Sequence, residues 1–270
     1  MRRALATVLA ALLAGLAALG LIGRGAGTVQ VAFRPEPGAT YRYEVRISST
    51  SETVLGAAAP ARSADDVLLV AEHTVLATGP DGVRVQVVLA EPEGDQRTFE
   101  VVFDRAAQLQ AIEAIEGVPA EVLGELGLAS VFPAAAGGPP DRGLAPGDRW
   151  EVDDRVALGA NPSLTRLTGE GRLVELAVEG GRDVARLRSV TVLPVLTSRS
   201  TPQGELLLDG IQRTTQDATH DLADGSIRSA TSTTTASYDL TVSPPLGTSG
   251  TPVTGTLTAT VSAETRRVDL

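Results

Sequence analysis

Cysteine and lysine are absent from this sequence of 270 residues, and aromatic residues make up only 3% of it. The absence of cysteine excludes disulfide bonds, thiolate metal sites, thiol nucleophiles and a lipid-modified N-terminal cysteine. A domain of this size can bury enough apolar surface without disulfides, so their absence does not argue against an oxidising compartment. Because aromatic residues are so scarce, a core must be built mainly from Val, Leu, Ala and Ile.

The charge balance is acidic, with 33 Asp and Glu residues against 23 basic ones and a formal net charge of −10. A surface of this sign repels phosphate backbones and anionic lipid headgroups. We therefore expect no nucleic-acid binding and no basic patch for docking to a membrane. Since every basic residue other than the two histidines is arginine, the choice of arginine at one position is no evidence for bidentate chemistry there.

The N-terminus has the pattern of an export signal. Arg2 and Arg3 precede an apolar run from Ala4 to Ile22, and Arg24 follows it. The positive charge keeps that end cytoplasmic, and the run is about as long as the ~20 residues that cross a bilayer as a helix. We expect residues 1–26 to be either a signal peptide or an N-terminal membrane anchor, and both remain open.

The remainder, residues 27–270, is expected to be one exported, β-rich domain that is either membrane-anchored or secreted. In its first block, at about residues 40–105, apolar residues alternate with polar ones. Val83, Val85 and Val87 recur at every second position, as expected for a half-buried strand. Gly and Pro residues between the alternating runs indicate tight turns.

The alternation changes in residues 106–128, which we predict to be a short helical insert. Leu109, Ile112 and Glu113 have the spacing of one helix face, and Pro119 stands where a second helical stretch would begin. A Pro/Gly-rich linker is expected at residues 133–147.

A second β block is expected at about residues 148–265, where hairpins surround Gly180 and Gly225. Together these features predict a mainly β (α+β) fold: a curved antiparallel sheet or half-barrel with the helical insert on its concave side, preceded by an N-terminal hydrophobic helix. Whether the two blocks form one sheet or two remains open, and we favour one.

The search for catalytic or metal-binding residues finds little. His73 and His220 are the only histidines, and both lie on strand faces with apolar neighbours. Asp217, Asp221 and Asp224 surround His220 in sequence, but strand alternation separates them, and Asp is common in turns for its local hydrogen bonds. A structural role is the favoured interpretation for all five, with a metal or acid/base site as the alternative.

Other catalytic signatures are missing. The sequence contains no Gly-x-Ser-x-Gly elbow, phosphate loop or dinucleotide fingerprint. The acid pairs Asp65/Asp66 and Asp153/Asp154 lack the spacing of a calcium loop. We therefore predict no catalytic residues, no metal ligands and no cofactor. A pair of carboxylates for glycoside hydrolysis could come from any two strands and stays open.

Three segments carry a resemblance. Phe33–Tyr43 has Pro-x-Pro-Gly before a Tyr-x-Tyr strand, Leu144–Trp150 reads Leu-Ala-Pro-Gly-Asp-Arg-Trp, and Asp217–Gly225 is an acidic hairpin. They resemble an uncharacterised family of exported, actinobacterial-like proteins. More loosely, the layout is similar to the LolA/LppX type of envelope protein, in which a curved sheet wraps helices and can hold acyl chains. The resemblance implies that fold, without the lipidated cysteine of its lipoprotein members.

These observations favour a non-enzymatic function outside the cytoplasm. The first hypothesis is a binding module whose concave, aliphatic face holds an apolar ligand such as a lipid. The alternative is a structural or protein-interaction module of the envelope with no cavity. A hydrolase that uses carboxylates is a third, less favoured reading.

Overall fold

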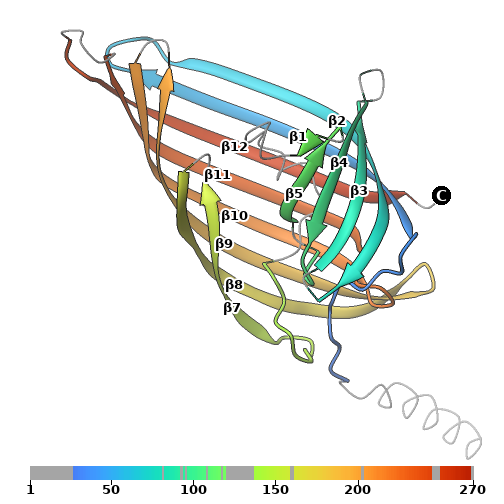
Figure 1. The fold of residues 1–270 in the computed structure, drawn as a ribbon. Helices are drawn as coiled ribbons and strands as arrows, with labels where there is room; N and C mark the ends of the chain where they lie inside the picture. The colour runs from blue at the N-terminus through green and yellow to red at the C-terminus, as the bar shows by residue number, and fades with distance from the viewer. Residues whose placement is uncertain are drawn as a thin grey trace, which may run out of the picture.

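The protein is described by a computed structural model that covers residues 27–80, 82–91, 94, 96–107, 109–116, 118–119, 137–158, 161–201, 204–244 and 250–268. These residues form one antiparallel sheet with the strand order β6-β5-β4-β3-β2-β1-β12-β11-β10-β9-β8-β7 (Figure 1). The strands are β1 (Thr40–Leu55), β2 (Ala61–Gly79), β3 (Gly82–Ala90), β4 (Gln96–Phe103), β5 (Leu109–Ile115), β6 (Val118–Pro119), β7 (Arg149–Leu158), β8 (Asn161–Glu179), β9 (Arg182–Thr201), β10 (Gly204–Asp221), β11 (Ile227–Ser243) and β12 (Val253–Val268).

The predicted β blocks form a single sheet because the first strand pairs with the last. β1 and β12 are hydrogen-bonded along their length, from Arg42 opposite Val268 to Leu55 opposite Gly255. The other pairings join strands that are neighbours in sequence. The sheet is open, and its two edge strands, β6 and β7, lie on either side of the segment that contains the predicted linker.

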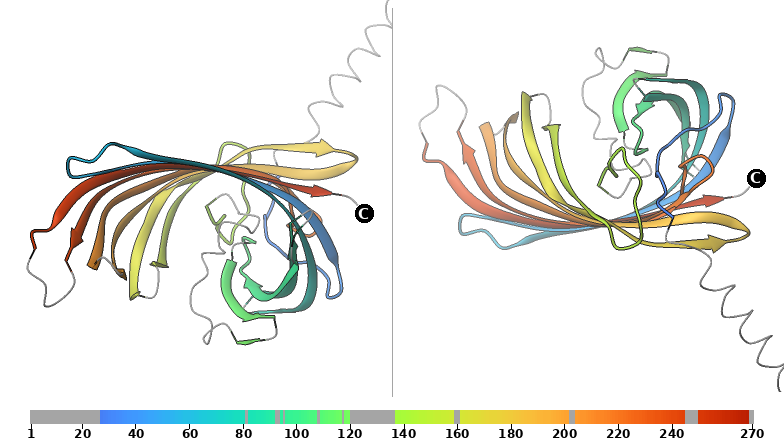
Figure 2. Two further views of the ribbon diagram at one scale, coloured as in Figure 1. Left: turned by 90° about the horizontal axis from the view of Figure 1, so that it is seen from above. Right: turned by 90° about the horizontal axis from the view of Figure 1, so that it is seen from below.

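Strand alternation divides the sheet into two faces. In β1, Tyr41, Tyr43 and Val45 are buried, while Arg42 and Glu44 between them are exposed. We call the face that carries the buried residues the inner face, and the opposite one the outer face. Figure 2 shows that the sheet is curved and that β3, β4 and β5 fold over one end of the inner face. The right-handed twist of long strands accounts for such coiling.

The main core lies at this covered end. Val45, Phe99 and Leu187, from the two halves of the chain, are among its fully buried members. The single tryptophan, Trp150, packs at its margin and donates a hydrogen bond from Nε1 to the carbonyl oxygen of Gly137 at 2.9 Å. Gly171 lies opposite Trp150, and a Cβ there would approach the indole ring to 2.3 Å. The core thus joins both β blocks.

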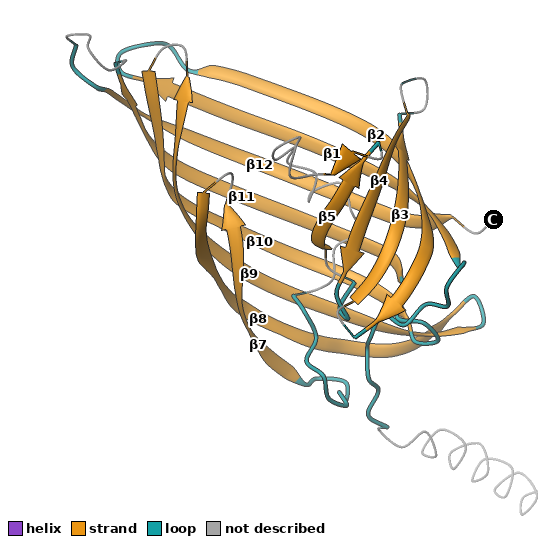
Figure 3. Cartoon of the chain, viewed as in Figure 1, coloured by secondary structure: helices purple, strands orange, loops and turns teal. Residues whose placement is uncertain are grey.

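The predicted helical insert is wrong over its first half. The described residues contain no helix (Figure 3): Ala106 lies in a turn, and Leu109–Ile115 forms β5. Two register shifts interrupt the pairing of β4 with β5. Each adds one residue to β5, so the inward-facing Leu109, Ile112 and Ile115 recur at every third position. This spacing imitates a helix face, although its cause is a pair of β-bulges.

Two other predicted segments lie outside the described residues. They are the N-terminal residues 1–26, predicted as a signal peptide or anchor, and most of the second helical stretch, from residue 120 onward. Within the described part of the chain, no helix meets the length and hydropathy needed to cross a bilayer.

Candidate functional site

The end of the inner face that lies beyond β3–β5 carries a second apolar cluster, separate from the main core. Its buried members are Val195, Tyr238 and Leu240, and the partly buried side chains packed against them are Leu55, Leu193, Leu206, Leu208, Ala236 and Leu257. All of them come from β1, β9, β10, β11 and β12. Among the described residues the cluster is therefore a single layer that belongs to the sheet, with no facing layer.

Strand register explains why these residues gather. Tyr238 of β11 lies opposite Leu257 of β12, and Leu240 lies opposite Leu208 of β10. Each is an inner-face position, because it continues the alternation that buries Ala230 and Ala218 in the main core. The same face is thus apolar at both ends of the long strands, but only one end is covered by β3–β5 (Figure 1).

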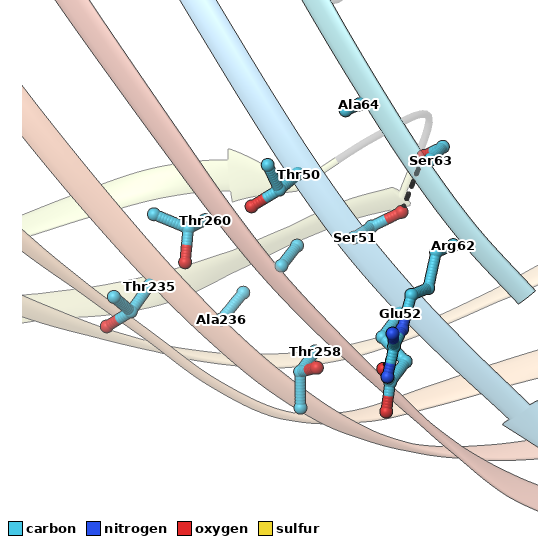
Figure 4. A pocket seen from close by; sticks show the side chains of 11 residues that line it. Thr50, Ser51, Glu52, Arg62, Ser63, Ala64, Thr235, Ala236, Thr258 and Thr260 are labelled. Carbon is cyan, nitrogen blue, oxygen red and sulfur yellow. Dashed lines mark hydrogen bonds and ion pairs between the residues drawn. The ribbon is translucent and has the colours of Figure 1, made fainter. Parts of the chain in front are cut away.

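The outer face has a broad hollow of about 590 Å³ across β11, β12, β1 and β2 (Figure 4). Its outer-face lining residues are Thr50, Glu52, Arg62, Ala64, Thr235, Thr258 and Thr260, and the inner-face residues Ser51, Ser63, Ala236 and Ala259 border it from the alternate positions of the same strands. Its one charged pair is Arg62 and Glu52, joined at 2.6 Å on an exposed surface. The lining offers hydroxyl groups but no histidine and no nucleophile beside a base, so it lacks the parts of a hydrolytic site.

The histidine and aspartates of the β10–β11 hairpin are separated by the fold. Asp217 lies on the outer face, where Arg188 holds it at 2.8 Å. His220 is buried at the covered end, and its Nδ1 lies 3.0 Å from the carbonyl oxygen of Gly225, to which it can donate. Burial lowers the pKa of His220 and keeps the imidazole neutral.

The two remaining aspartates brace the turn. Asp221 is buried and forms ion pairs with Arg182 at 3.2 Å and Arg228 at 3.6 Å. Asp224 accepts a hydrogen bond from the Tyr41 hydroxyl at 2.8 Å. Asp224 thus fixes the hairpin against β1, and Asp221 fixes it against the start of β9. Across the described residues, no group of three or more His, Asp or Glu is placed to hold a metal ion.

The other singled-out residues occupy equally ordinary places. His73 is buried in the main core, 4.9 Å from the Tyr43 ring and 5.7 Å from the Phe103 ring between centroids. Burial lowers its pKa to about 3 and raises the pKa of Tyr43. Asp153 accepts two hydrogen bonds of 2.7 Å from Arg166, which lower its pKa.

The remaining predicted acids lie apart from these sites. Asp65 and Asp66 are exposed on β2, and Asp154 accepts a hydrogen bond from the backbone of Arg155. The pair on β2 and the pair on β7 do not contact each other.

Sequence reasoning missed the second apolar cluster as a unit. Its signal was present in the alternation of Ala236, Tyr238 and Leu240, with Ser and Asp between them. The alternation does not reveal, however, which end of a long strand will be covered by another part of the chain.

No protein-family model matches the chain, and a search among curated proteins finds no similar sequence. The functional argument therefore rests on the residues of this protein.

Proposed function

We propose that this protein is a non-enzymatic binding module of the cell envelope that holds an apolar ligand, such as a lipid chain, on the end of its inner face beyond β3–β5. The second apolar cluster is the observation that carries the proposal. Within the described part of the chain no second layer packs on this face, and the leucines that flank the buried Val195, Tyr238 and Leu240 are only partly buried. Covering their remaining apolar area with an alkyl chain is favourable. The N-terminal sequence supports export, and the separated histidines and aspartates give no support to catalysis.

The test is native mass spectrometry of the protein recovered gently from an exporting host, with organic extraction of bound material. We expect extra mass that extracts as lipid. In the variant Leu208→Gln, a carboxamide replaces a partly buried alkyl group of the cluster, so the bound fraction should fall. A wild-type protein that carries no lipid and takes up none when lipids are added would refute the proposal.

Leu207→Gln is the matched control. Leu207 is the next residue in β10, points to the outer face and is 38% exposed, so the same substitution there should leave lipid binding unchanged. Equal loss in both variants would indicate a general effect on folding. Urea unfolding followed by Trp150 fluorescence shows whether each variant keeps its fold.

A second candidate function, a protein-interaction module, is favoured by a different observation. On the outer face, Leu196 is 64% exposed and Ile211 is 53% exposed, on the adjacent strands β9 and β10. Exposed apolar residues that gather in this way are typical of contact surfaces. A photo-crosslinker at Leu196 should capture a discrete partner in cells, and one at Thr260 should not. No captured species from position 196 would remove this candidate.

A further inference from the structure

Between the main core and the second apolar cluster, the inner face carries a band of small polar side chains, which we call the polar belt. It consists of Ser49, Ser51, Ser189, Thr191, Gln212, Thr214, Gln216, Ser232 and Thr234. The register places its threonines side by side, with Thr234 opposite Thr214 and Thr214 opposite Thr191. The belt therefore runs across β11, β10 and β9 next to the second apolar cluster, and Ser49 and Ser51 of β1 are separated from this part by Ala259 and Val261 of β12.

The belt offers hydrogen bonds in addition to those it makes internally. Thr214 and Thr234 are joined through their Oγ1 atoms at 2.8 Å, and Gln212 donates from Nε2 to the Tyr238 hydroxyl at 2.6 Å. A tyrosine hydroxyl that accepts a bond keeps its own proton to donate, and the Gln212 Oε1 can still accept. Ser189 is 1% exposed and packs against Gly137, so a ligand on this face does not reach its Oγ. A hydroxyl, ester or amide group of a ligand can instead take the place of water at the Tyr238 hydroxyl and the Gln212 Oε1.

The charges around the belt exclude one class of polar group. At the flanks of the belt, the inner-face positions are Asp65 on β2 and Asp154 on β7, and both carry carboxylates. The described inner-face side chains between them include no arginine. A phosphate or carboxylate placed here would be dehydrated without a cation and would face acidic neighbours. Hydroxyl, ester and amide groups have no such cost when they are hydrogen-bonded.

Tyr238 connects the two surfaces. Its ring belongs to the second apolar cluster, while its hydroxyl binds Gln212 of the polar belt. A ligand that lies along the strands would therefore change from apolar contacts to hydrogen bonds over the length of the Tyr238 side chain. This order of surfaces matches a molecule with an alkyl chain and an adjoining polar group.

We propose that the ligand of the inner face is an uncharged amphiphile, with its alkyl chain on the second apolar cluster and its hydroxyl, ester or amide groups on the polar belt. This inference rests on the proposed function, because it specifies the ligand of the same surface. Anionic and cationic amphiphiles of equal chain length are the competing ligands that the test must separate.

The experiment compares three probes that differ mainly in head-group charge: monolauroylglycerol, laurate and dodecylamine. Their binding to the delipidated protein from an exporting host is measured by titration calorimetry below the concentrations at which the probes self-associate. We expect monolauroylglycerol to bind about tenfold more tightly than either charged probe, as the loss of a satisfied polar contact implies. Stronger binding of laurate or dodecylamine would overturn the inference but leave apolar binding intact.

A double variant tests the belt directly. Gln212→Leu with Thr214→Val removes hydrogen-bonding groups and keeps similar volume, so the preference for monolauroylglycerol should fall to about the level of the charged probes. Thr215→Val, at the next position and on the outer face, is the matched control and should keep the preference. An unchanged preference in the double variant would also overturn the inference. Failure of all three probes to bind would instead refute the proposed function itself.

Discussion

At the scale of single residues, the buried histidines make stability depend on pH. Burial lowers the pKa of His73 to about 3, well below the ~6.5 of an exposed histidine. Between these two values the unfolded chain binds a proton that the folded protein does not. The free energy of unfolding therefore rises with pH in this window: the contribution is complete above about 6.5 and declines as the pH falls toward 3.

We expect His73→Gln to weaken this decline. Between pH 6.5 and pH 5, protonation of His73 in the unfolded chain should lower the free energy of unfolding of the wild type by about 2 kcal/mol. The variant lacks this contribution, so its free energy of unfolding should fall less over the same range. His220, whose pKa is lowered in the same direction, remains in both proteins and acts as an internal reference. Urea unfolding at the two pH values, followed by Trp150 fluorescence, measures the difference. Equal losses in both proteins would show that His73 does not carry the effect.

At the scale of elements, the alternating strands could be predicted from the sequence, and β5 could not. Val83, Val85 and Val87 alternate without interruption, because β3 pairs with β4 without a register shift. In β5, two bulges change the spacing of the inward-facing residues from two to three. A bulge depends on the partner strand, which the local sequence does not contain, so period alone favoured a helix.

The bulges lead to an unusual prediction about deletions. Glu113 has no partner residue in β4, so its deletion closes one bulge and leaves Ile112 and Ile115 facing inward. We expect this variant to fold, with a loss of about 1–3 kcal/mol in the free energy of unfolding. Deletion of Gln86 from β3 should abolish folding, because a one-residue slip turns one part of the strand outward. Urea unfolding and size-exclusion chromatography measure both.

Part of any loss on deleting Glu113 comes from its ion pair with Arg84, at 2.8 Å on the surface. Glu113→Gln removes the pair without changing the length of β5, and it should cost less than about 1 kcal/mol. If deletion of Glu113 destabilised the protein as much as deletion of Gln86, Glu113 would not be the extra residue that the register of β4 and β5 indicates.

At the scale of the whole molecule, the candidate site depends on long-range arrangement more than on any motif. The sequence favoured one curved sheet and indicated a break near residues 133–147, and both edge strands do adjoin that segment. It could not show that β12 lies between β1 and β11, since this pairing joins opposite ends of the chain. Nor could it show that β3–β5 cover one end of the inner face and do not extend over the second apolar cluster (Figure 1). Such features depend on contacts between residues far apart in the sequence, and local periodicity does not reveal them.

The placement of β12 makes the two β blocks one cooperative unit, which truncation can test. A chain that ends at Gly250 lacks β12, so β1 and β11 each lose a partner strand and the main core loses the link between its two halves. Because unpaired inner strands expose backbone hydrogen-bonding groups, we expect this chain to aggregate, with no folded species. A chain that ends at Val268 keeps all of β12 and should retain the wild-type urea midpoint. Far-UV circular dichroism, size-exclusion chromatography and Trp150 fluorescence measure both chains. A cooperative unfolding transition reported by Trp150 in the shorter chain would show that the C-terminal block folds alone, and that closure by β12 is not required.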